Sequence, residues 1–306
     1  MREEIKNWNI FISKVKHYLG EHECIEVSTS ILNKFEVPNE HIKPFKVISK
    51  IPPHKLFLHT SPELKMKELL SLGSRDIYQI CTTFRDEEVG SWHTKEFQML
   101  EWYRVGIHID KMIKEVNGLL LLLLDRPSDD PIKKTKIAYK DLFYSLVHED
   151  YPSTKTNLIE CLKKHDINFD GNLLTHNDLL DLLFSSVMQL NFSPHELVTI
   201  TQFPSDQASM ASVDPTDNSI STRFECFYRG IELANGYEEL RQVDLLAQRF
   251  KNISKKEGSE YLEIPKDYLT KVSTLLPQCC GVSIGLNRLY ALSRGATSIP
   301  SDRIYC

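Results

Sequence analysis

A charged segment around Arg85 and a second segment from Glu96 to Tyr103 have residue types suited to binding an activated nucleotide. Arg85 and Asp86 stand at the start of the polar loop between them, and an arginine beside carboxylates offers a cation for phosphate and anions for an ammonium group or a metal ion. If the second segment is a strand, Phe97 and Glu101 share one face and lie about 13 Å apart. That distance suits a purine joined through phosphate to an amino acid, although an ordinary hairpin with a buried aromatic side chain and solvated charges has the same pattern.

A second group of candidates lies at the start of a predicted helix. The segment that ends at Glu63 predicts a strand followed by a helix cap, with Ser61 as the cap and Pro62 at the first helical position. The helix is expected to cover residues 64–72 and to stop at Gly73. A carboxylate in the first turn complements the helix dipole, and from the sequence alone we expect no more of Glu63.

Two carboxylates further along the chain, Glu232 and Glu239, could bind a metal ion. They are seven residues apart, so in one unbroken strand they would point to opposite faces. Asn235-Gly236 between them predicts a turn or bulge, which would bring both to one point. Two such carboxylates suit a Mg²⁺ ion that bridges phosphate oxygens, and a hairpin with two exposed acids fits the spacing equally well.

A glycine-rich segment near the C-terminus completes the set. Gly281 and Gly285 would lie on one face of a strand, where the missing side chains let a ligand approach the backbone. Arg288 follows at the start of a predicted helix and could reach a terminal phosphate. Ser283 stands between the two glycines on the same face.

The elements that must position these residues follow from the hydrophobic pattern. Residues 1–20 predict an amphipathic helix, and residues 24–30 predict a strand. Residues 107–200 are expected to be mostly helical, and the apolar run from Leu119 to Leu124 is a buried helix that is too short to span a membrane. Strands are predicted to resume at residues 196–201 and 223–233.

Bulk properties exclude several classes of protein. The 306 residues can form one large domain, and 41% apolar and 26% charged residues are typical of a globular protein. A net charge of −5 gives no electrostatic footprint for nucleic acid, so tRNA is not an expected partner. The seven cysteines are scattered without a CxxC pair, which favours reduced thiols over zinc or disulfides. The N-terminus has no signal-peptide pattern, so we expect a cytoplasmic protein.

Taken together and in this order, these segments resemble the class II aminoacyl-tRNA synthetases. Phe84-Arg85-x-Glu87 with the downstream Phe97 resembles motif 2, and the sequence of residues 96–103 is most similar to the lysyl branch. Residues 281–289 resemble motif 3, and the N-terminal helix and strand are a looser match to motif 1, which forms the dimer interface in that family.

The resemblance extends from about residue 5 to residue 300 and implies the fold and the domains. It implies an α+β fold in which an antiparallel sheet is flanked by helices. Residues 1–306 would form a single catalytic domain with a helical insertion at about 107–195. No anticodon-binding domain is expected, because motif 1 begins almost at Met1. A homodimer is expected from motif 1.

More narrowly, the chain is similar to the short lysyl paralogues that attach β-lysine to a lysine of elongation factor P. This implies an ATP-dependent ligase with Mg²⁺, in which Arg85 and Arg288 are catalytic and Glu232 and Glu239 hold the metal ion. The resemblance implies contacts with ATP for Arg85, Asp86, Glu87, His93, Thr94, Phe97, Glu232, Leu233, Gly285 and Arg288. It implies contacts with the amino acid, lysine or β-lysine, for Ser61, Pro62, Glu63, Glu101, Tyr103, Asn235, Glu239 and Ser283.

Several positions depart from the family pattern. Ser30 replaces a proline, Thr94 an asparagine and Asn287 an aspartate, and Gln242 stands among expected acids. Ser283 is larger than the glycine or alanine usual at its position, which narrows the expected pocket. The sequence therefore leaves open whether the substrate is α-lysine, β-lysine or another diamino acid.

Two other functions fit the same motifs. A related enzyme could act on another amino acid or carrier, as an asparagine-synthetase-like paralogue would, but a buried Glu101 would repel aspartate. A regulatory paralogue could keep the fold without catalysis, but it would have no need for Arg85, Glu232, Glu239 and Arg288 together.

Overall fold

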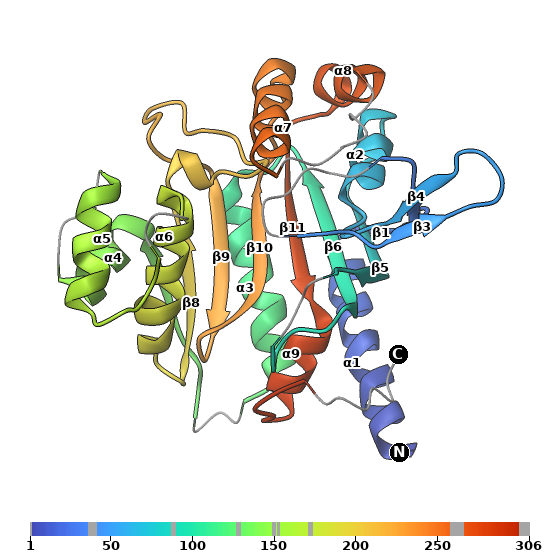
Figure 1. Ribbon diagram of the computed structural model, residues 1–306. Helices are drawn as coiled ribbons and strands as arrows, with labels where there is room; N and C mark the ends of the chain where they lie inside the picture. Colours follow the sequence, from blue (N-terminus) through green and yellow to red (C-terminus); the bar gives the residue numbers. More distant parts are fainter. Residues whose placement is uncertain are drawn as a thin grey trace. The chain divides into compact units, whose positions relative to one another are not determined.

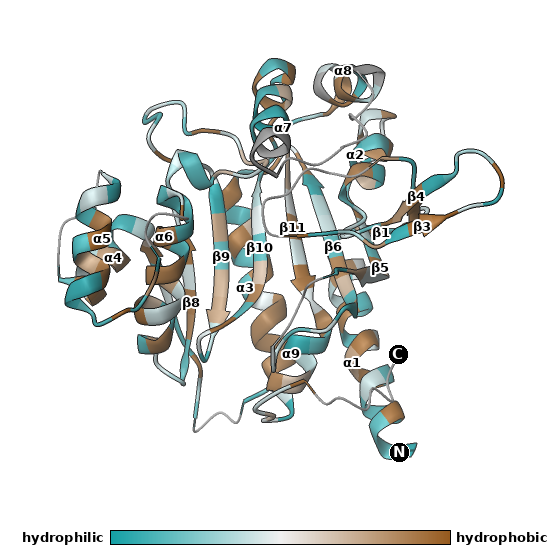
Figure 2. Cartoon of the chain, in the orientation of Figure 1, coloured by the Kyte–Doolittle hydropathy of each residue, from teal (hydrophilic) through white to brown (hydrophobic). Residues whose placement is uncertain are grey.

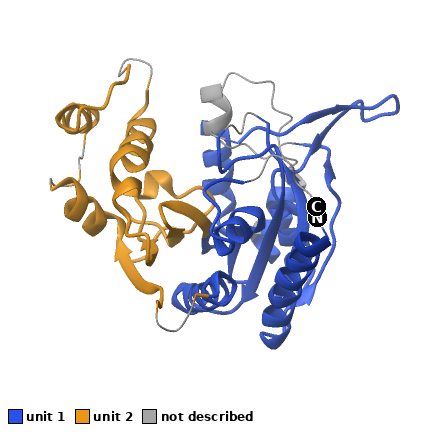
Figure 3. Cartoon of the chain, turned by 90° about the horizontal axis from the view of Figure 1, so that it is seen from below, with its two compact units in different colours: residues 1–125, 236–306 blue, residues 126–235 orange. Residues whose placement is uncertain are grey.

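The computed structural model describes residues 2–35, 42–86, 90–126, 130–148, 151, 154–170, 174–257 and 266–299, without the side chains of residues 253–257, 266, 267 and 273. The chain divides into two compact units, residues 1–125 with 236–306 and residues 126–235 (Figure 3). The second unit thus begins at residue 126, whereas the helical insertion was expected from about residue 107. The prediction of one catalytic domain over the whole chain stays a prediction.

The first unit contains two sheets (Figure 1). In the larger one the strand order is β1–β5–β6–β11, with β1 parallel to β5 and the other two pairs antiparallel. The three short strands β2, β4 and β3 form a separate antiparallel sheet. The bounds are β1 (Ile25–Glu26), β2 (Leu32–Asn33), β3 (Lys46–Ile48), β4 (Lys55–Leu58), β5 (Ile77–Phe84), β6 (Glu96–Val105) and β11 (Cys279–Gly285).

Six described helices belong to this unit: α1 (Arg2–Glu21), α2 (Glu63–Ser71), α3 (Ile109–Leu124), α7 (Val243–Glu257), α8 (Lys266–Leu275) and α9 (Leu286–Ser293). The expected N-terminal helix is α1, which buries Phe11, Val15 and Leu19 at helical spacing. The apolar run that ends at Leu124 lies in α3, which packs against α1 and α9 and is strongly hydrophobic along much of its length (Figure 2). Among the helices that the structure describes, none combines the length and hydrophobicity of a membrane span.

Apolar packing fixes α2, the helix that begins at Glu63. Met66 and Leu70 of α2 belong to a buried cluster with Ile77 of β5 and Tyr103 of β6. Helix α8 adds to this cluster from its own buried face. Since each of these side chains is almost fully buried, this packing also buries three polar residues of α2, Glu63, Lys67 and Ser71.

The second unit is described by itself. β7 (Lys133–Ala138) runs parallel to β8 (Glu196–Thr201), and β8 is antiparallel to β9 (Arg223–Tyr228). β10 (Ile231–Glu238) is the neighbour of β9 in the sheet, and its residues from Gly236 onward belong to the first unit. The described α-helices are α4 (Tyr139–Val147), α5 (Lys155–Lys164) and α6 (His176–Leu183). A short π-helix at Phe184–Met188 follows α6, and two short 3₁₀ helices lie at Gln189–Asn191 and Ser205–Gln207. The core lies between these helices and β8 and β9.

The expected α+β class, with antiparallel strands flanked by helices, is confirmed, and so is the hairpin of β5 and β6. The strand predicted at residues 196–201 is β8. The strand predicted at residues 24–30 is only two residues long, and its pairing with β5 covers Ile25 and Glu26. The strand predicted at residues 223–233 is instead two strands, β9 and β10, with a turn between them.

Candidate active site

Strands β6 and β11 bring two of the predicted groups to one place. Their antiparallel register pairs Ser283 with Glu101 and Gly281 with Tyr103. Alternate residues of a strand share a face, so these four residues point to the same side of the sheet. On the other side of β6, strand β5 places Gln79 opposite Glu101. The pairing of β6 with β11 therefore places candidate residues of the hairpin and of the glycine segment side by side.

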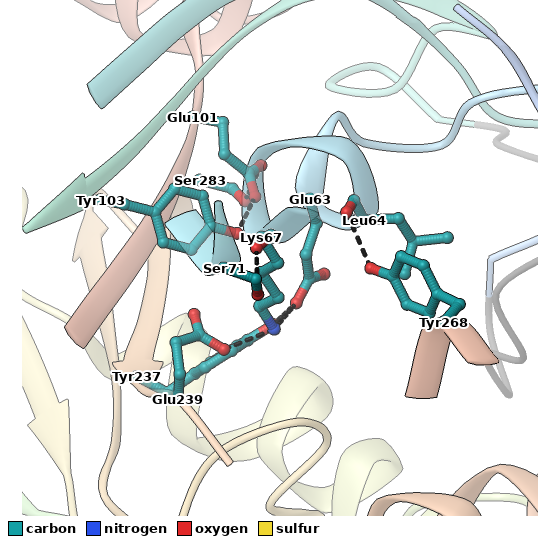
Figure 4. Close-up of polar contacts among 10 residues, drawn as sticks. All are labelled: Glu63, Leu64, Lys67, Ser71, Glu101, Tyr103, Tyr237, Glu239, Tyr268 and Ser283. Atoms are coloured by element: carbon teal, nitrogen blue, oxygen red, sulfur yellow. Dashed lines mark hydrogen bonds and ion pairs between the residues drawn. The ribbon is translucent and has the colours of Figure 1, made fainter. Parts of the chain in front are cut away.

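The carboxylate of Glu101 is almost fully buried, with 2% of the residue exposed. The hydroxyl of Tyr103 donates to its Oε1 and the hydroxyl of Ser283 to its Oε2, each over 2.7 Å (Figure 4). Burial and the nearby charge of Glu63 raise the pKa of Glu101 to about 7, although the two hydrogen bonds and Lys67 oppose that rise. Because the two donors that contact it are neutral, Glu101 is suited to receive a cationic group from a ligand.

A lysine lies between two further carboxylates of the cluster (Figure 4). Glu63 and Lys67 are one turn apart on α2, and Nζ of Lys67 lies 2.5 Å from Oε1 of Glu63. The same Nζ forms an ion pair with Oε2 of Glu239, the residue that follows β10. The hydroxyl of Tyr237 also donates to Oε1 of Glu63, over 3.0 Å. Lys67 thus joins α2 to the end of β10.

Burial and charge act in opposite directions on this ion pair. Burial by itself lowers the pKa of Lys67, but Glu239 and Glu63 raise it well above its ordinary value, so the side chain stays an ammonium. Burial raises the pKa of Glu239 above its ordinary value, and Lys67 opposes that rise. Nζ of Lys67 approaches both carboxylates closely, so it is the cation that opposes the effect of burial on the pKa of Glu239.

Gly281 allows the close approach of two of these side chains. A Cβ atom built at Gly281 would lie 2.5 Å from Oε1 of Glu239 and 2.5 Å from the ring of Tyr103. Any other residue would push one of them away from the cluster. The glycine was expected to make room for a ligand, and in the structure it makes room for Glu239 and Tyr103.

Arg85 and Phe97 face each other where β5 and β6 open into their loop. The guanidinium carbon of Arg85 lies 5.1 Å from the centre of the Phe97 ring, and its Nε donates to the backbone oxygen of Thr60 over 3.3 Å. Both side chains are half-buried. A guanidinium beside a flat aromatic ring can bind a phosphate and stack a base, which fits the ATP contacts predicted for these two residues.

Other residues predicted to bind ATP make contacts within the loop itself. The carboxylate of Asp86 lies 2.8 Å from Nζ of Lys95, and the hydroxyl of Thr94 donates to a backbone oxygen two residues further on. His93 is exposed, and Glu87 lies outside the described residues. The structure therefore brings Arg85 and Phe97 together but gives Asp86 and Thr94 partners on the loop.

Helix α9 begins directly after Gly285 and places Arg288 in its first turn, as predicted. Nε of Arg288 donates to the backbone oxygen of Trp92 over 2.9 Å, which ties this arginine to the loop between β5 and β6. Asn287 is buried, and its side-chain oxygen accepts from the backbone N–H of Gln98 over 2.6 Å. Asn287 thus joins α9 to β6 without the charge of the usual aspartate.

In the second unit, β9 holds the side chain of Asn235. Nε of Arg223 donates to its oxygen over 3.3 Å, and its amide nitrogen donates to Oε1 of Glu225 over 3.2 Å. Arg223 and Glu225 also form an ion pair. Burial raises the pKa of Glu225 to about 7, Arg223 opposes that rise and Glu232 adds to it. Leu233, a further predicted ATP contact, is buried on β10, the strand that also carries Asn235.

The turn predicted at Asn235-Gly236 is wrong. β10 runs unbroken through this pair, and the chain reverses earlier, at Arg229 and Gly230, where φ is +53° and +71°. Positive φ at two successive residues is what a tight hairpin requires, so the reversal was already complete before Asn235. The turn is therefore absent, while the bulge that was the other expectation for Asn235-Gly236, and with it the meeting of Glu232 and Glu239, stays a prediction. In the described part of the chain, no three His, Cys, Asp or Glu side chains are grouped to hold a metal ion, and the Mg²⁺ site stays a prediction.

The helix cap predicted at Ser61 is also wrong. Helix α2 begins at Glu63, so Pro62 is the residue before the helix, and no side chain caps it. The backbone oxygen of Pro62 instead accepts from the N–H groups of Lys65 and Met66. Glu63 is the first helical residue and is buried in the cluster, which gives it a role beyond complementing the helix dipole.

Two residues of this cluster, Lys67 and Tyr237, were not predicted. A signal for Lys67 was present, because it falls on the same helical stripe as Glu63, Leu64 and Leu70, where an apolar residue is expected. A lysine on a buried stripe next to a carboxylate indicates an internal ion pair. Tyr237 gave no such signal, since its hydroxyl reaches Glu63 only through the fold.

Known proteins match the chain over nearly its whole length. A family described as tRNA synthetases class II (D, K and N) matches residues 1–305. The chain is 38% identical over 309 aligned positions to the elongation factor P–(R)-beta-lysine ligase of Buchnera aphidicola subsp. Acyrthosiphon pisum (strain APS), which covers 96% of this chain and 92% of that protein. A protein of the same name from Haemophilus influenzae (strain ATCC 51907 / DSM 11121 / KW20 / Rd) is 34% identical over 290 positions, covering 92% of this chain and 88% of its own. A third, from Pasteurella multocida (strain Pm70), is 33% identical over 297 positions, covering 94% of this chain and 90% of its own.

Proposed function

The chain belongs to the class II tRNA synthetases of the D, K and N type, and we propose that it is an ATP-dependent ligase that modifies elongation factor P with (R)-β-lysine. In a first step the carboxylate of the amino acid attacks the α-phosphorus of ATP, and pyrophosphate leaves. In a second step the ε-amine of a lysine on elongation factor P attacks the acyl carbon, loses a proton and releases AMP. The names of the three relatives support both the amino acid and the acceptor.

One observation carries this proposal: Glu101 is a buried carboxylate contacted by two neutral hydroxyl groups, 2.7 Å away each. A substrate with a second ammonium group supplies the missing positive charge. Glu63 and Glu239, with Ser61, would receive the other amino group, and Asn235 the carboxylate. An aspartate or asparagine side chain offers no cation, so Glu101 disfavours the related paralogues that use those amino acids.

The nucleotide would use the other end of the β5–β6 hairpin. Arg85 would bind the α-phosphate and the substrate carboxylate, and so stabilise the charge that develops as the bond to phosphorus forms. Phe97 would stack the adenine, and Arg288 would bind the terminal phosphate. The cation–π contact of Arg85 and Phe97 supports this placement, because it already sets the guanidinium beside the ring. The acceptor amine needs no further base in this scheme, since holding it beside the adenylate supplies much of the rate.

Magnesium enters the proposal through its preference for oxygen ligands, usually one or two carboxylates with phosphates and water. Glu232 fits that preference as a partly exposed carboxylate. Glu239 has the right donor atoms but is in an ion pair with Lys67, which supports the amino-acid role of this residue more than its metal role. When bound, the ion would neutralise charge on the phosphates of ATP.

Ser283 would set the size of the amino-acid pocket. Its hydroxyl is held against Glu101, so the side chain fills space that a glycine would leave open. This supports a preference for β-lysine over α-lysine. We further propose a cytoplasmic homodimer; the six described cysteines are free thiols, in keeping with a reducing compartment, and the dimer rests on the family.

The test is amino-acid-dependent ATP–pyrophosphate exchange with Mg²⁺ and a panel of α-lysine, both β-lysine enantiomers, ornithine, asparagine and aspartate. We expect strong exchange with (R)-β-lysine and little with the others. Mass spectrometry of elongation factor P after incubation with enzyme, ATP and (R)-β-lysine should then show one added β-lysyl group. ATP binding without exchange for any amino acid of the panel would contradict the proposal and favour a regulatory paralogue.

A further inference from the structure

We infer that Lys67 is a positioning residue of the amino-acid pocket, which holds Glu63 and Glu239 in place for a substrate ammonium and restricts the pocket to amino acids with two ammonium groups. The inference rests on the proposed function, because it concerns how that same pocket recognises its substrate. It starts from the position of Lys67, which is 5% exposed and bridges two elements that are far apart in sequence.

Stability alone does not explain a lysine at this position. Lys67 lies on the buried stripe of α2, between Leu64 and Leu70, where an apolar side chain would pack without desolvating a charge. Replacing a buried ion pair by apolar residues is often neutral or stabilising, so such a pair is weak grounds for a structural role. The lysine therefore has to be explained by what surrounds its ammonium group.

The groups that face this ammonium are acidic. Glu63 comes from α2 and Glu239 from the end of β10, and both contact the ammonium group. Glu101 of β6 belongs to the same cluster, where the charges of Glu63 and Lys67 act on it. The hydroxyl groups of Tyr103 and Tyr237 complete the cluster. In their ionised forms the three carboxylates exceed the single lysine by two negative charges. A diamino acid whose carboxylate is bound elsewhere, at Arg85, brings the two positive charges that are needed.

The contacts also fix which oxygen atoms remain for the substrate. Lys67 and Tyr237 both contact Oε1 of Glu63, which leaves Oε2 of that carboxylate for an ammonium group. On Glu239, Lys67 contacts Oε2, while Oε1 lies against Gly281. Without Lys67 the two carboxylates would lose the cation that they share and would repel each other. They would then turn apart or bind a solvent cation, and the acceptor geometry would be lost.

The experiment compares Lys67→Met, which keeps an unbranched side chain one atom shorter and removes its charge, with Lys65→Met on the same helix. Lys65 also forms an ion pair, with Glu68, but lies outside the cluster. Both variants are assayed by ATP–pyrophosphate exchange with (R)-β-lysine. Lys67→Met should raise KM for (R)-β-lysine by about tenfold or more, as loss of one partner of a buried charge pair commonly does. The kcat value and the KM for ATP should stay within about twofold of the wild type, a split that reports lost substrate positioning.

A second variant separates charge from packing. In Lys67→Ala, added ethylammonium chloride should lower the raised KM for (R)-β-lysine, whereas ethanol, which has the same size but no charge, should not. Melting temperatures and ATP binding show that each variant is folded. The wild type should also discriminate against 3-aminohexanoate, which lacks the distal ammonium group of β-lysine, by about 100-fold in kcat/KM.

The outcomes separate the inference from the proposed function. If the wild type exchanges pyrophosphate with no diamino acid, the proposed function fails. If the wild type is active but Lys67→Met behaves like Lys65→Met, or if ethanol restores Lys67→Ala as well as ethylammonium does, the inference is wrong. A lower KM in Lys67→Met would also overturn it, because Lys67 would then be a competitor of the substrate.

Discussion

Glu101 in the first unit and Glu225 in the second are two buried carboxylates that differ in their partners. Each is at most 8% exposed, and burial raises the pKa of each to about 7. Glu225 forms an ion pair with Arg223 and accepts from the amide of Asn235. Glu101 accepts from two hydroxyl groups, and the charge of Lys67 lowers the pKa of Glu101 less than those two hydrogen bonds do.

This difference indicates that Glu101 binds the substrate, whereas Glu225 supports the structure around it. A buried carboxylate with its own cation already has its charge compensated. A buried carboxylate that has only neutral hydrogen-bond donors stays destabilised by its desolvation until a ligand supplies an ammonium group. We therefore expect changes at Glu101 to alter substrate binding, and changes at Glu225 to alter stability and the placement of Asn235.

The largest effect is expected from Glu101→Gln. The amide keeps the size of the side chain but cannot form an ion pair with the distal ammonium group of (R)-β-lysine. We expect kcat/KM for (R)-β-lysine to fall by about 100-fold or more, since losing one partner of a buried charge pair costs roughly 2–5 kcal/mol. Pyrophosphate exchange measures this value, and ATP binding by calorimetry is the control that should stay unchanged. A loss below tenfold would contradict the role of Glu101.

The pH dependence of the wild type should reveal the same carboxylate. The pKa of Glu101 is raised to about 7 in the ligand-free protein, so the group becomes neutral as the pH falls below this value. Only the ionised form pairs with an ammonium group, and kcat/KM for (R)-β-lysine should therefore fall by about tenfold per unit below pH 7. Glu225→Gln should keep this profile, and Glu101→Gln should lose it. An unchanged profile in Glu101→Gln would assign the titration to another group.

A smaller effect on activity is expected from Glu225→Gln. This variant removes the ion pair between Arg223 and residue 225 and keeps the contacts of Arg223 with the backbone oxygen of Gln207 and with Asn235. We expect the free energy of unfolding to fall by about 2 kcal/mol, in the range for hydrogen bonds to charged groups. Urea denaturation measures it, and kcat/KM should change by less than about tenfold. A loss of activity as large as in Glu101→Gln would remove the distinction between the two carboxylates.

The smallest effect is expected from Ser283→Ala, which removes one of the two donors to Glu101. Loss of one hydrogen bond should lower kcat/KM for (R)-β-lysine by about threefold. Removing the hydroxyl oxygen also enlarges the pocket, so pyrophosphate exchange with α-lysine should fall less than exchange with (R)-β-lysine. The ratio of the two rates measures this, with Ser293→Ala, on α9, as a control that should keep the wild-type ratio, since that hydroxyl donates its proton to the backbone oxygen of Tyr290.

Much of the site was predictable because strand periodicity is simple. Alternation placed Glu101 and Tyr103 on one face, and the glycine segment with Arg288 marked the strand and helix that follow. These features are local, so a short stretch of sequence determines them. The matched family extends the same motifs to almost the whole chain.

The features of the site that were not predicted depend mostly on contacts between segments that are far apart in the sequence. Lys67 becomes part of the site only because Glu239, 172 residues later, ends beside it. The turn predicted at Asn235 failed because a neighbouring pair, Arg229 and Gly230, had already reversed the chain. The cap predicted at Ser61 failed because the helix starts after Pro62, whose carbonyl accepts the first bonds. In each case the local propensity was real, and the tertiary structure or a stronger local signal prevailed.

The most direct test of the account is the selectivity for a second ammonium group, measured as the ratio of kcat/KM for (R)-β-lysine to that for 3-aminohexanoate in pyrophosphate exchange. The account predicts a ratio of about 100 or more for the wild type and for Glu225→Gln, and a ratio close to one for Glu101→Gln. A ratio close to one in the wild type, or a wild-type ratio that persists in Glu101→Gln, would contradict the claim that this buried carboxylate selects a diamino acid.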